Sequence, residues 1–251
     1  MKSTFWFTVA LTLLGGQGTA RAGIVYDSET GAALGFTGST PRTFMGQGFT
    51  VADPGGPVEI TSMSLVLVAA TAVNYAATRI NVEFWDNFNS ASSPVFSNPL
   101  GVNSFSTGPI ITAGATAFTF TLTFGSPIPL TGLTNHGIAV NWQSDAGGTG
   151  TFIDDTNLTA ALRVSGSSNI LPGANTSPNS GYYRNASGET DLNFQSSDAR
   201  TLSGVTNGGL VFRLTAAEVA VPEPGTMLLL GSALVVLAGV RRPRARLAGR
   251  P

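Results

Sequence analysis

Residues Ala117 to Phe124, AFTFTLTF, alternate apolar and polar side chains with a strict period of two. Phenylalanine and leucine fall on one face and threonine on the other, which predicts a strand with one buried and one exposed face. The same alternation recurs from Arg79 to Phe84, from Ile138 to Trp142 and from Leu210 to Leu214. Val58 to Ala70 is more continuously apolar, which predicts a longer and more central strand.

Turn-forming sequences separate these runs, among them Asp53-Pro54-Gly55-Gly56-Pro57 and Asp145-Ala146-Gly147-Gly148. The central part of the chain contains no long run of apolar residues at the spacing of an amphipathic helix. Many short strands joined by such turns predict an all-β fold, specifically an antiparallel β-sandwich of jelly-roll type, with a closed barrel as the second choice. We expect one domain over residues 23–218, because a body of this size can bury a sufficient core.

Charge and cysteine content exclude several classes of function. Residues 23–221 contain six arginines, no lysine and thirteen acidic residues, a formal charge of −7. An acidic body without a basic patch argues against nucleic-acid binding, which depends on Lys and Arg at phosphates. The chain has no cysteine, which excludes disulfides, thiol nucleophiles and Cys-rich zinc sites.

The N-terminal residues 1–22 have the three parts of a secretory signal peptide. Lys2 supplies the positive start, Phe5 to Leu14 the apolar stretch, and Ala20-Arg21-Ala22 a small-x-small cleavage site. We therefore expect signal peptidase to cleave before Gly23 during export through the secretion machinery.

The C-terminal residues 219–246 also have three parts in order. Pro222, Glu223 and Pro224 form a stiff extended motif, because proline fixes φ and lacks a backbone donor. An apolar segment, Thr226 to Val240, follows, and then a basic cluster from Arg241 to Arg246, with residues 247–251 as a short tail. The segment predicts a hydrophobic helix that only marginally spans a membrane, and the arginines place its end on the cytoplasmic side.

This tail resembles the PEP-CTERM sorting signal of Gram-negative bacteria. The resemblance covers only about the last thirty residues. It implies that an exosortase, a membrane cysteine transpeptidase, cuts near the Pro-Glu-Pro motif, and that the product reaches the cell surface or the extracellular matrix. A permanent single-span membrane anchor is the alternative.

Candidate chemistry in the body is sparse. His136, the only histidine, is expected to be a surface or turn residue, since no Gly-x-Ser-x-Gly elbow accompanies it. Glu83 with Asp86 would be the best carboxylate pair for a glycosidase. Calcium could be held by loop carboxylates, for which the candidates are Asp86, Asp154, Asp155, Glu189 and Asp191. Taken singly, each of these acids is better explained as a turn-former, and we assign no catalytic, cofactor or metal residue.

Among the aromatic residues, Trp142 is in register with Ile138 and Val140, which predicts a place in the core. Trp85 is out of register with Ile80 and Val82, so it lies on the opposite face or at the strand's end. Among the aromatics, Trp85 is therefore the best candidate for an exposed ligand contact, although packing beneath a loop explains it better. Other aromatics that could contribute to a sugar-stacking surface are Phe88, Tyr182 and Tyr183.

Three functions are compatible with these features. The first is a non-enzymatic structural or adhesive module, displayed at the surface and associated with biofilm exopolysaccharide. The second is a lectin-like carbohydrate-binding module that could depend on calcium. The third is a secreted hydrolase that uses carboxylates, and it has the weakest support.

Overall fold

A computed structural model describes the body of the chain. The described residues are 22–35, 44–52, 57–89, 95–131, 135–155, 157–177, 181–184, 196–202, 205 and 208–218. The chain divides into a compact unit, Arg21–Val219, and a second unit of residues 1–20 and 220–251, none of which is among the described residues. The C-terminal hydrophobic helix and the signal peptide predicted above therefore lie outside the described part, apart from Ala22.

The first sheet is built around β4, Val58–Ala69, the long central strand that the sequence predicts. One edge of β4 pairs with β9, Thr116–Leu130, along its whole length. The other edge pairs with β17, Phe212–Glu218, and then with the short β12, Leu158–Ala160. β1, Ala22–Asp27, pairs with β17, so the main order is β1-β17-β4-β9, antiparallel throughout.

The second sheet has the main order β3-β10-β6-β7 and is also antiparallel. Its long strands are β3 (Phe44–Thr50), β10 (His136–Asp145), β6 (Ala77–Asn89) and β7 (Val95–Thr107). Short strands extend it: β15 (Tyr182–Arg184) and β14 (Ala174–Asn175) on β3, β16 (Ala199–Arg200) on β15, and β11 (Ile153–Asp154) on β10.

Two small ribbons complete the strands, β2 (Leu34–Gly35) with β13 (Leu162–Arg163), and β5 (Val73–Tyr75) with β8 (Ile110–Thr112). The one helical element among the described residues is a short 3-10 turn, Ser196–Asp198. In that part of the chain, no helix is long and apolar enough to cross a membrane.

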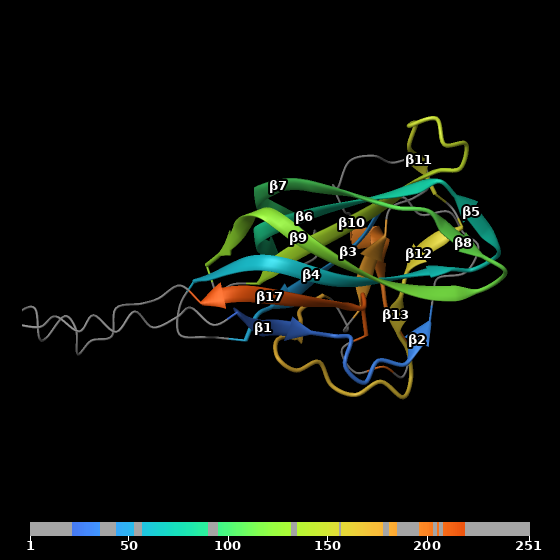
Figure 1. Ribbon diagram of the computed structural model, residues 1–251. Helices are drawn as coiled ribbons and strands as arrows, with labels where there is room; N and C mark the ends of the chain where they lie inside the picture. The colour runs from blue at the N-terminus through green and yellow to red at the C-terminus, as the bar shows by residue number, and fades with distance from the viewer. Residues whose placement is uncertain are drawn as a thin grey trace, which may run out of the picture. The chain divides into compact units, whose positions relative to one another are not determined.

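The two main sheets pack face to face and enclose one core (Figure 1). Rings from opposite sheets meet there: Phe49 of β3 lies 5.9 Å from Phe212 of β17, and Phe84 of β6 lies 5.8 Å from Phe124 of β9, both edge to face. Such contacts stabilise a core beyond the area they bury. Trp142 is fully buried in this core, as predicted. The prediction of an antiparallel sandwich is confirmed.

The burial pattern of β9 agrees with the alternation of apolar and polar residues from which the strand was predicted. Leu122 and Phe124 are buried against the core, Phe118 and Phe120 are half-buried on the same face, and the threonines between them are exposed. The strand therefore places apolar side chains inward and hydroxyls outward, as a strand with one solvated face does.

Both ends of the body leave the sandwich at the same end. Ala22 pairs with Ala217, and Glu218 pairs with Val58 at the start of β4. This end, defined by Ala22, Val58 and Glu218, is called the tail end. At the opposite end, called the far end, lie the turn between β4 and β5, the turn that follows β8 and the loop of residues 146–152 (Figure 1).

Candidate functional site

The predicted sorting residues Pro222, Glu223 and Pro224 lie outside the described residues, as does Ala20 of the expected signal cleavage site. Ala22, the other residue of that cleavage site, is the first residue of β1 and pairs with Ala217. Cleavage before Gly23 would remove only this first pair of the strand.

Trp85 is not an exposed ligand contact. It has 5 % of its surface exposed and packs with Phe88, Ala139 and Tyr183 on the outer face of the second sheet. The sheet leaves room for these rings because small residues occupy it below them: Gly137 pairs with Gly48, and a Cβ added to Gly48 would lie 2.1 Å from a ring carbon of Phe88. The parity that places Trp85 on the opposite face is correct, and the side chain is packed among neighbouring residues, so it is not available as the exposed contact for which it was a candidate.

His136 is buried, and this corrects the expectation of a surface or turn residue. It begins β10 with its side chain fully enclosed and its ring 5.6 Å from that of Phe49. Its Nδ1 lies 3.4 Å from Asp86 Oδ1, and the same carboxylate oxygen accepts from the Thr131 backbone N–H at 2.9 Å. Burial lowers the pKa of His136, and the nearby Asp86 opposes this only in part.

A catalytic role for the His136–Asp86 pair would require a nucleophile. Among the described residues, no serine or threonine hydroxyl hydrogen-bonds to either ring nitrogen of His136. Glu83 does not join the pair either. Successive residues of a strand point to opposite faces, so Glu83 shares the outer face with Trp85, whereas Asp86 is on the side of Phe84 and the core.

The aspartates near the far end hold loops. Asp145 accepts hydrogen bonds from the backbone N–H groups of Thr149 and Gly150, at 3.1 and 2.7 Å. Desolvation would raise the pKa of Asp145, but the backbone donors of the loop outweigh it and lower the pKa. Asp155 accepts from the N–H groups of Asn157 and Leu158. Asp145 and Asp155 are therefore both turn-formers, as the sequence suggests.

Among the described residues, no three His, Asp or Glu side chains lie close enough together to bind a metal ion. Two of the calcium candidates, Glu189 and Asp191, lie outside the described part.

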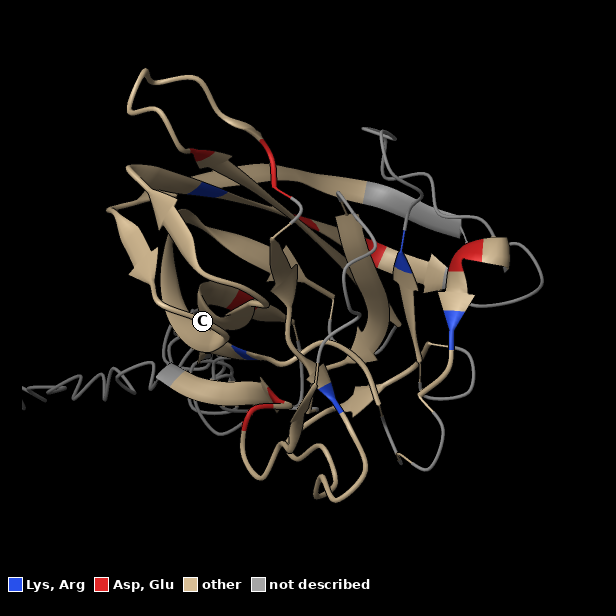
Figure 2. Ribbon diagram, turned by 90° about the vertical axis from the view of Figure 1, so that its right-hand side faces the viewer, with Lys and Arg blue, Asp and Glu red and all other residues tan. Residues whose placement is uncertain are grey.

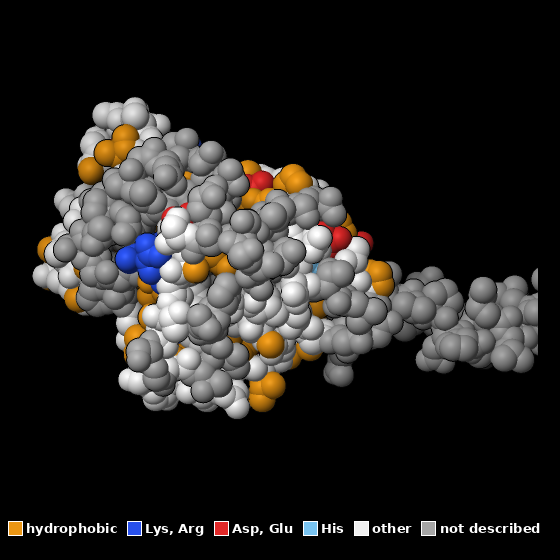
Figure 3. All heavy atoms as spheres, turned by 180° about the vertical axis from the view of Figure 1, so that it is seen from behind, with side chains coloured by type: hydrophobic (Ala, Val, Ile, Leu, Met, Phe, Trp, Pro, Cys, Tyr) orange, Lys and Arg blue, Asp and Glu red, His pale blue; other side chains and the backbone are white. Residues whose placement is uncertain are grey.

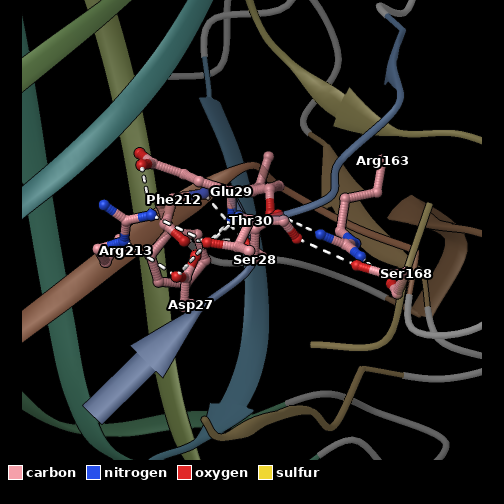
Figure 4. A network of polar contacts seen from close by, with 9 residues as sticks. Asp27, Ser28, Glu29, Thr30, Arg163, Ser168, Phe212 and Arg213 are labelled. Carbon is pink, nitrogen blue, oxygen red and sulfur yellow. Dashed lines mark hydrogen bonds and ion pairs between the residues drawn. The ribbon is translucent and has the colours of Figure 1, made fainter. Parts of the chain in front are cut away.

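A second polar network closes the end of β1 (Figure 4). Asp27 Oδ2 lies 3.1 Å from Arg213 Nε, and Asp27 Oδ1 accepts from the backbone of Glu29 and Thr30. Burial would raise the pKa of Asp27, but the hydrogen bonds from Thr30 and Arg213 outweigh it and hold the pKa below its ordinary value. Arg163 is fully buried and donates to the carbonyl oxygens of Ser28 and Ser168. Because these contacts join strands and loops to one another, the network stabilises the fold and is not a binding site.

The outer face of the second sheet carries an extended polar array that sequence reasoning missed, called here the amide ladder. It consists of Ser104, Asn81, Asn141, Gln143 and Asp154, one or two side chains from each of β7, β6, β10 and β11. Ser104 Oγ donates to Asn81 Oδ1 at 2.7 Å, and Asn81 Nδ2 donates to Asn141 Oδ1 at 2.7 Å. Asp154 Oδ1 then accepts from the amides of Asn141 and Gln143, each at 3.1 Å.

An aromatic group flanks the amide ladder. The Arg79 guanidinium lies 3.9 Å from the centre of the Phe152 ring, and Arg79 pairs in register with Gln143 of the ladder. Such a face offers donors, acceptors and one ring, a combination suited to a polar, uncharged ligand. In the sequence, Asn81 and Asn141 alternate with apolar residues, which places both side chains on the outer face of the sheet. That they lie next to each other follows only from the strand register.

Among the described residues, charged and apolar side chains do not gather elsewhere into a further site. Acidic and basic residues are dispersed over several strands and loops (Figure 2). On the face seen from behind, the coloured hydrophobic side chains are scattered and form no continuous patch among the described residues (Figure 3). The described body is thus an antiparallel β-sandwich whose polar networks connect its own strands.

Comparison with known proteins adds one finding at the C-terminus. Residues 220–242 match the family model described as the PEP-CTERM protein-sorting motif. The prediction made from the tail is confirmed: the chain carries this sorting motif, which indicates export and processing by an exosortase. Neither the curated proteins nor the solved structures contain a match to the chain.

Proposed function

We propose that this protein is an exported, exosortase-processed surface protein whose sandwich acts as a non-catalytic structural or adhesive module in the extracellular matrix. The observation that carries the proposal is the sorting motif at residues 220–242, directly after a folded body that ends at Glu218. A non-enzymatic role is supported by the carboxylates singled out in the sequence, because Asp86, Asp154 and Asp155 are each engaged by backbone or side-chain donors of the fold.

The fold fits display in a defined orientation. Only three residues, 219–221, separate the last paired residue, Glu218, from Pro222. Three extended residues reach about 10 Å, so a product held through this tail would keep the tail end of the sandwich toward the surface. The far end, with the loop that Asp145 closes, would then face outward.

The finer fold assignment that we favour is a jelly roll. Its support is the order β1-β17-β4-β9 over β3-β10-β6-β7, in which most connections between consecutive main strands cross from one sheet to the other. This is the connectivity of two Greek keys folded into a double sheet.

The test of sorting is the intact mass of the protein from the native host, measured separately in membrane and medium fractions. Beside the unchanged chain we would measure Glu223→Ala and, as a matched control, Ser232→Ala in the apolar segment. We expect a C-terminus near Pro224 in the unchanged chain and in the control, and its loss in Glu223→Ala. A tail that is intact through Pro251 in the unchanged chain would contradict exosortase processing and favour a permanent single-span anchor.

A second candidate function is recognition of a carbohydrate, possible with or without calcium, on the amide ladder. The observation that favours it is the row of amide and carboxylate groups beside Phe152 on one sheet face. Binding of the host's exopolysaccharide would be compared between the unchanged chain, Asn81→Leu and the control Thr215→Val on the other sheet, with and without chelator. Equal binding by all three would remove this candidate.

A further inference from the structure

Among the described strands, the outer edge of β9 carries the longest stretch without a protective device. Natural sheets protect edge strands with charges, prolines, bulges, short length or a covering segment. The edge of β1 is covered, since Val25 O accepts from the Ala52 N–H and the Asp27 N–H donates to Pro172 O. A further irregularity interrupts its pairing between Ile24 and Tyr26.

The second sheet is protected at the first half of β7 and at β16, whereas residues 102–107 of β7 pair with β6 without interruption and contain no charge or proline. β7 contains Pro99 and a left-handed Gly101 with φ of 88°, and its register with β6 shifts between Glu83 and Trp85. At the opposite edge, β16 has only two residues and one of them is Arg200.

β9 divides into a protected and an unprotected half. Residues 125–130 contain Pro127 and Pro129, and the register with β4 shifts between Ile60 and Ser62, which pair with Ile128 and Thr123. Residues 116–124 contain no proline, no charge and no bulge, and they pair without interruption from Thr116 to Thr123. In the described part of the chain, β4 is the one strand that pairs with them.

The charge distribution favours a second copy of this chain as the partner. The body has a formal charge of −7, which opposes self-association, yet the chain contains no Asp, Glu, Lys or Arg from Asn87 to Ser144. This interval includes all of β7, β8 and β9, and Phe105 of β7 lies 5.5 Å from Phe124 of β9. The side of the sandwich formed by β7 and β9 is thus uncharged, while the described charges lie on other elements (Figure 2). Two copies meet there without repulsion between ionised side chains.

We propose that residues 116–124 of two copies pair edge to edge as antiparallel strands, which joins the two sheets of β1-β17-β4-β9 into one continuous sheet. The contact is isologous, since the same nine residues serve both copies. Thr119, Thr121 and Thr123 are exposed on one face, and they meet their counterparts across the new pair, where threonine pairs are favourable. Strand addition of this kind takes its affinity from backbone hydrogen bonds.

Antiparallel pairing also fixes how the two copies are oriented. β9 runs from the far end, where Thr116 pairs with Ala69, to the tail end, where Leu130 pairs with Val58. The unprotected half is therefore the far half, and pairing it antiparallel directs the two tail ends away from each other. If the proposed function is correct and each tail is held by a surface, such a pair bridges two facing surfaces and not two neighbours on the same one.

The first test is the mass of the full chain in mild detergent as a function of concentration, by light scattering after size exclusion. Thr121→Lys adds the edge charge that natural sheets use, and Thr151→Lys adds the same charge on an exposed residue of the far-end loop. We expect Thr121→Lys to weaken self-association by at least about tenfold, because like charges placed opposite each other destabilise a strand pair. Thr151→Lys should associate as the unchanged chain does. A monomeric unchanged chain, or equal association of the two variants, would overturn the proposal.

The second test uses the absence of cysteine from the chain. Single-cysteine variants Thr119→Cys, Thr121→Cys and Thr123→Cys are oxidised singly and in mixed pairs, with Thr151→Cys as the control. An antiparallel pair predicts rapid cross-linking only at positions that are opposite across one two-fold axis. The result is one variant alone, one mixed pair of adjacent positions alone, or Thr121→Cys together with the mixed pair of positions 119 and 123. Cross-linking no faster than that of Thr151→Cys, or equal cross-linking of all three, would overturn it. Because this readout needs no exosortase, its failure is separate from failure of the sorting proposal.

Discussion

Replacing Gln47 with leucine should destabilise the sandwich strongly, although it places an apolar residue in an apolar core. Gln47 is on the inner side of β3 and fully buried. Its Nε2 donates to the Tyr26 hydroxyl at 2.8 Å, and its Oε1 accepts from the Leu210 backbone N–H at 2.7 Å. The side chain therefore links the second sheet to β1 of the first sheet and to Leu210, two residues before β17 begins.

The expected cost follows from the groups left behind. Leucine would leave the Leu210 N–H buried without its acceptor, which costs about 1–3 kcal/mol, and would remove the hydrogen bond to Tyr26, worth about 0.5–1.5 kcal/mol. The sum is about 1.5–4.5 kcal/mol, or a fall in melting temperature of about 3–18 °C for a domain of this size.

The assay is urea unfolding at neutral pH, followed by tryptophan fluorescence and circular dichroism. Gln143→Leu is the matched control, because Gln143 is half-buried on the outer face and its partners there can be re-solvated. That change should cost less than about 1 kcal/mol. Equal losses in the two variants would refute the reasoning that the inter-sheet hydrogen bonds of Gln47 carry the difference.

Three further predictions test packing, titration and display. Gly48→Ala should destabilise the body by about 1–3 kcal/mol because its Cβ would overlap the Phe88 ring, whereas Gly125→Ala, with no atom within 4 Å of its Cβ, should be near neutral in the same unfolding assay. The free energy of unfolding should fall as pH drops below about 7, by up to about 1.4 kcal/mol per pH unit, because the folded pKa of His136 lies below 6.5 and the unfolded chain therefore binds the proton first. A His136→Leu variant should lose this pH dependence. If the variant keeps the same slope, the slope comes from other groups. On intact cells, a bulky maleimide should label Thr151→Cys at the far end faster than Glu59→Cys at the tail end, and the reverse order would contradict the proposed orientation.

The strands and their faces could be predicted from the sequence because alternation is a local property. Residues 117–124 and 58–70 gave the correct strands, and the position of Trp142 followed from its parity with Ile138. The helix expected in the tail lies outside the described residues, so it stays a prediction.

The errors concern residues whose surroundings come from distant parts of the chain. His136 is enclosed in part by Phe49, and Trp85 lies on a sheet face whose small residues, Gly48 and Ala139, belong to neighbouring strands. Strand parity places a side chain on a face, but it does not show what covers that face. The amide ladder needed the register of four strands at once, which no local pattern supplies.

If the domain is displayed as proposed, the two ends of β9 would serve different needs. At the tail end, Pro127, Pro129 and the register shift protect the edge where neighbouring copies on the same surface would approach with parallel orientation. At the far end, the edge that such devices would block is open and uncharged, and it extends about 30 Å at 3.4 Å per residue. A protein selected only to stay monomeric would gain from protecting both halves of this edge. The confinement of protection to the tail half therefore argues for contact between far ends, which is the geometry of adhesion between facing surfaces.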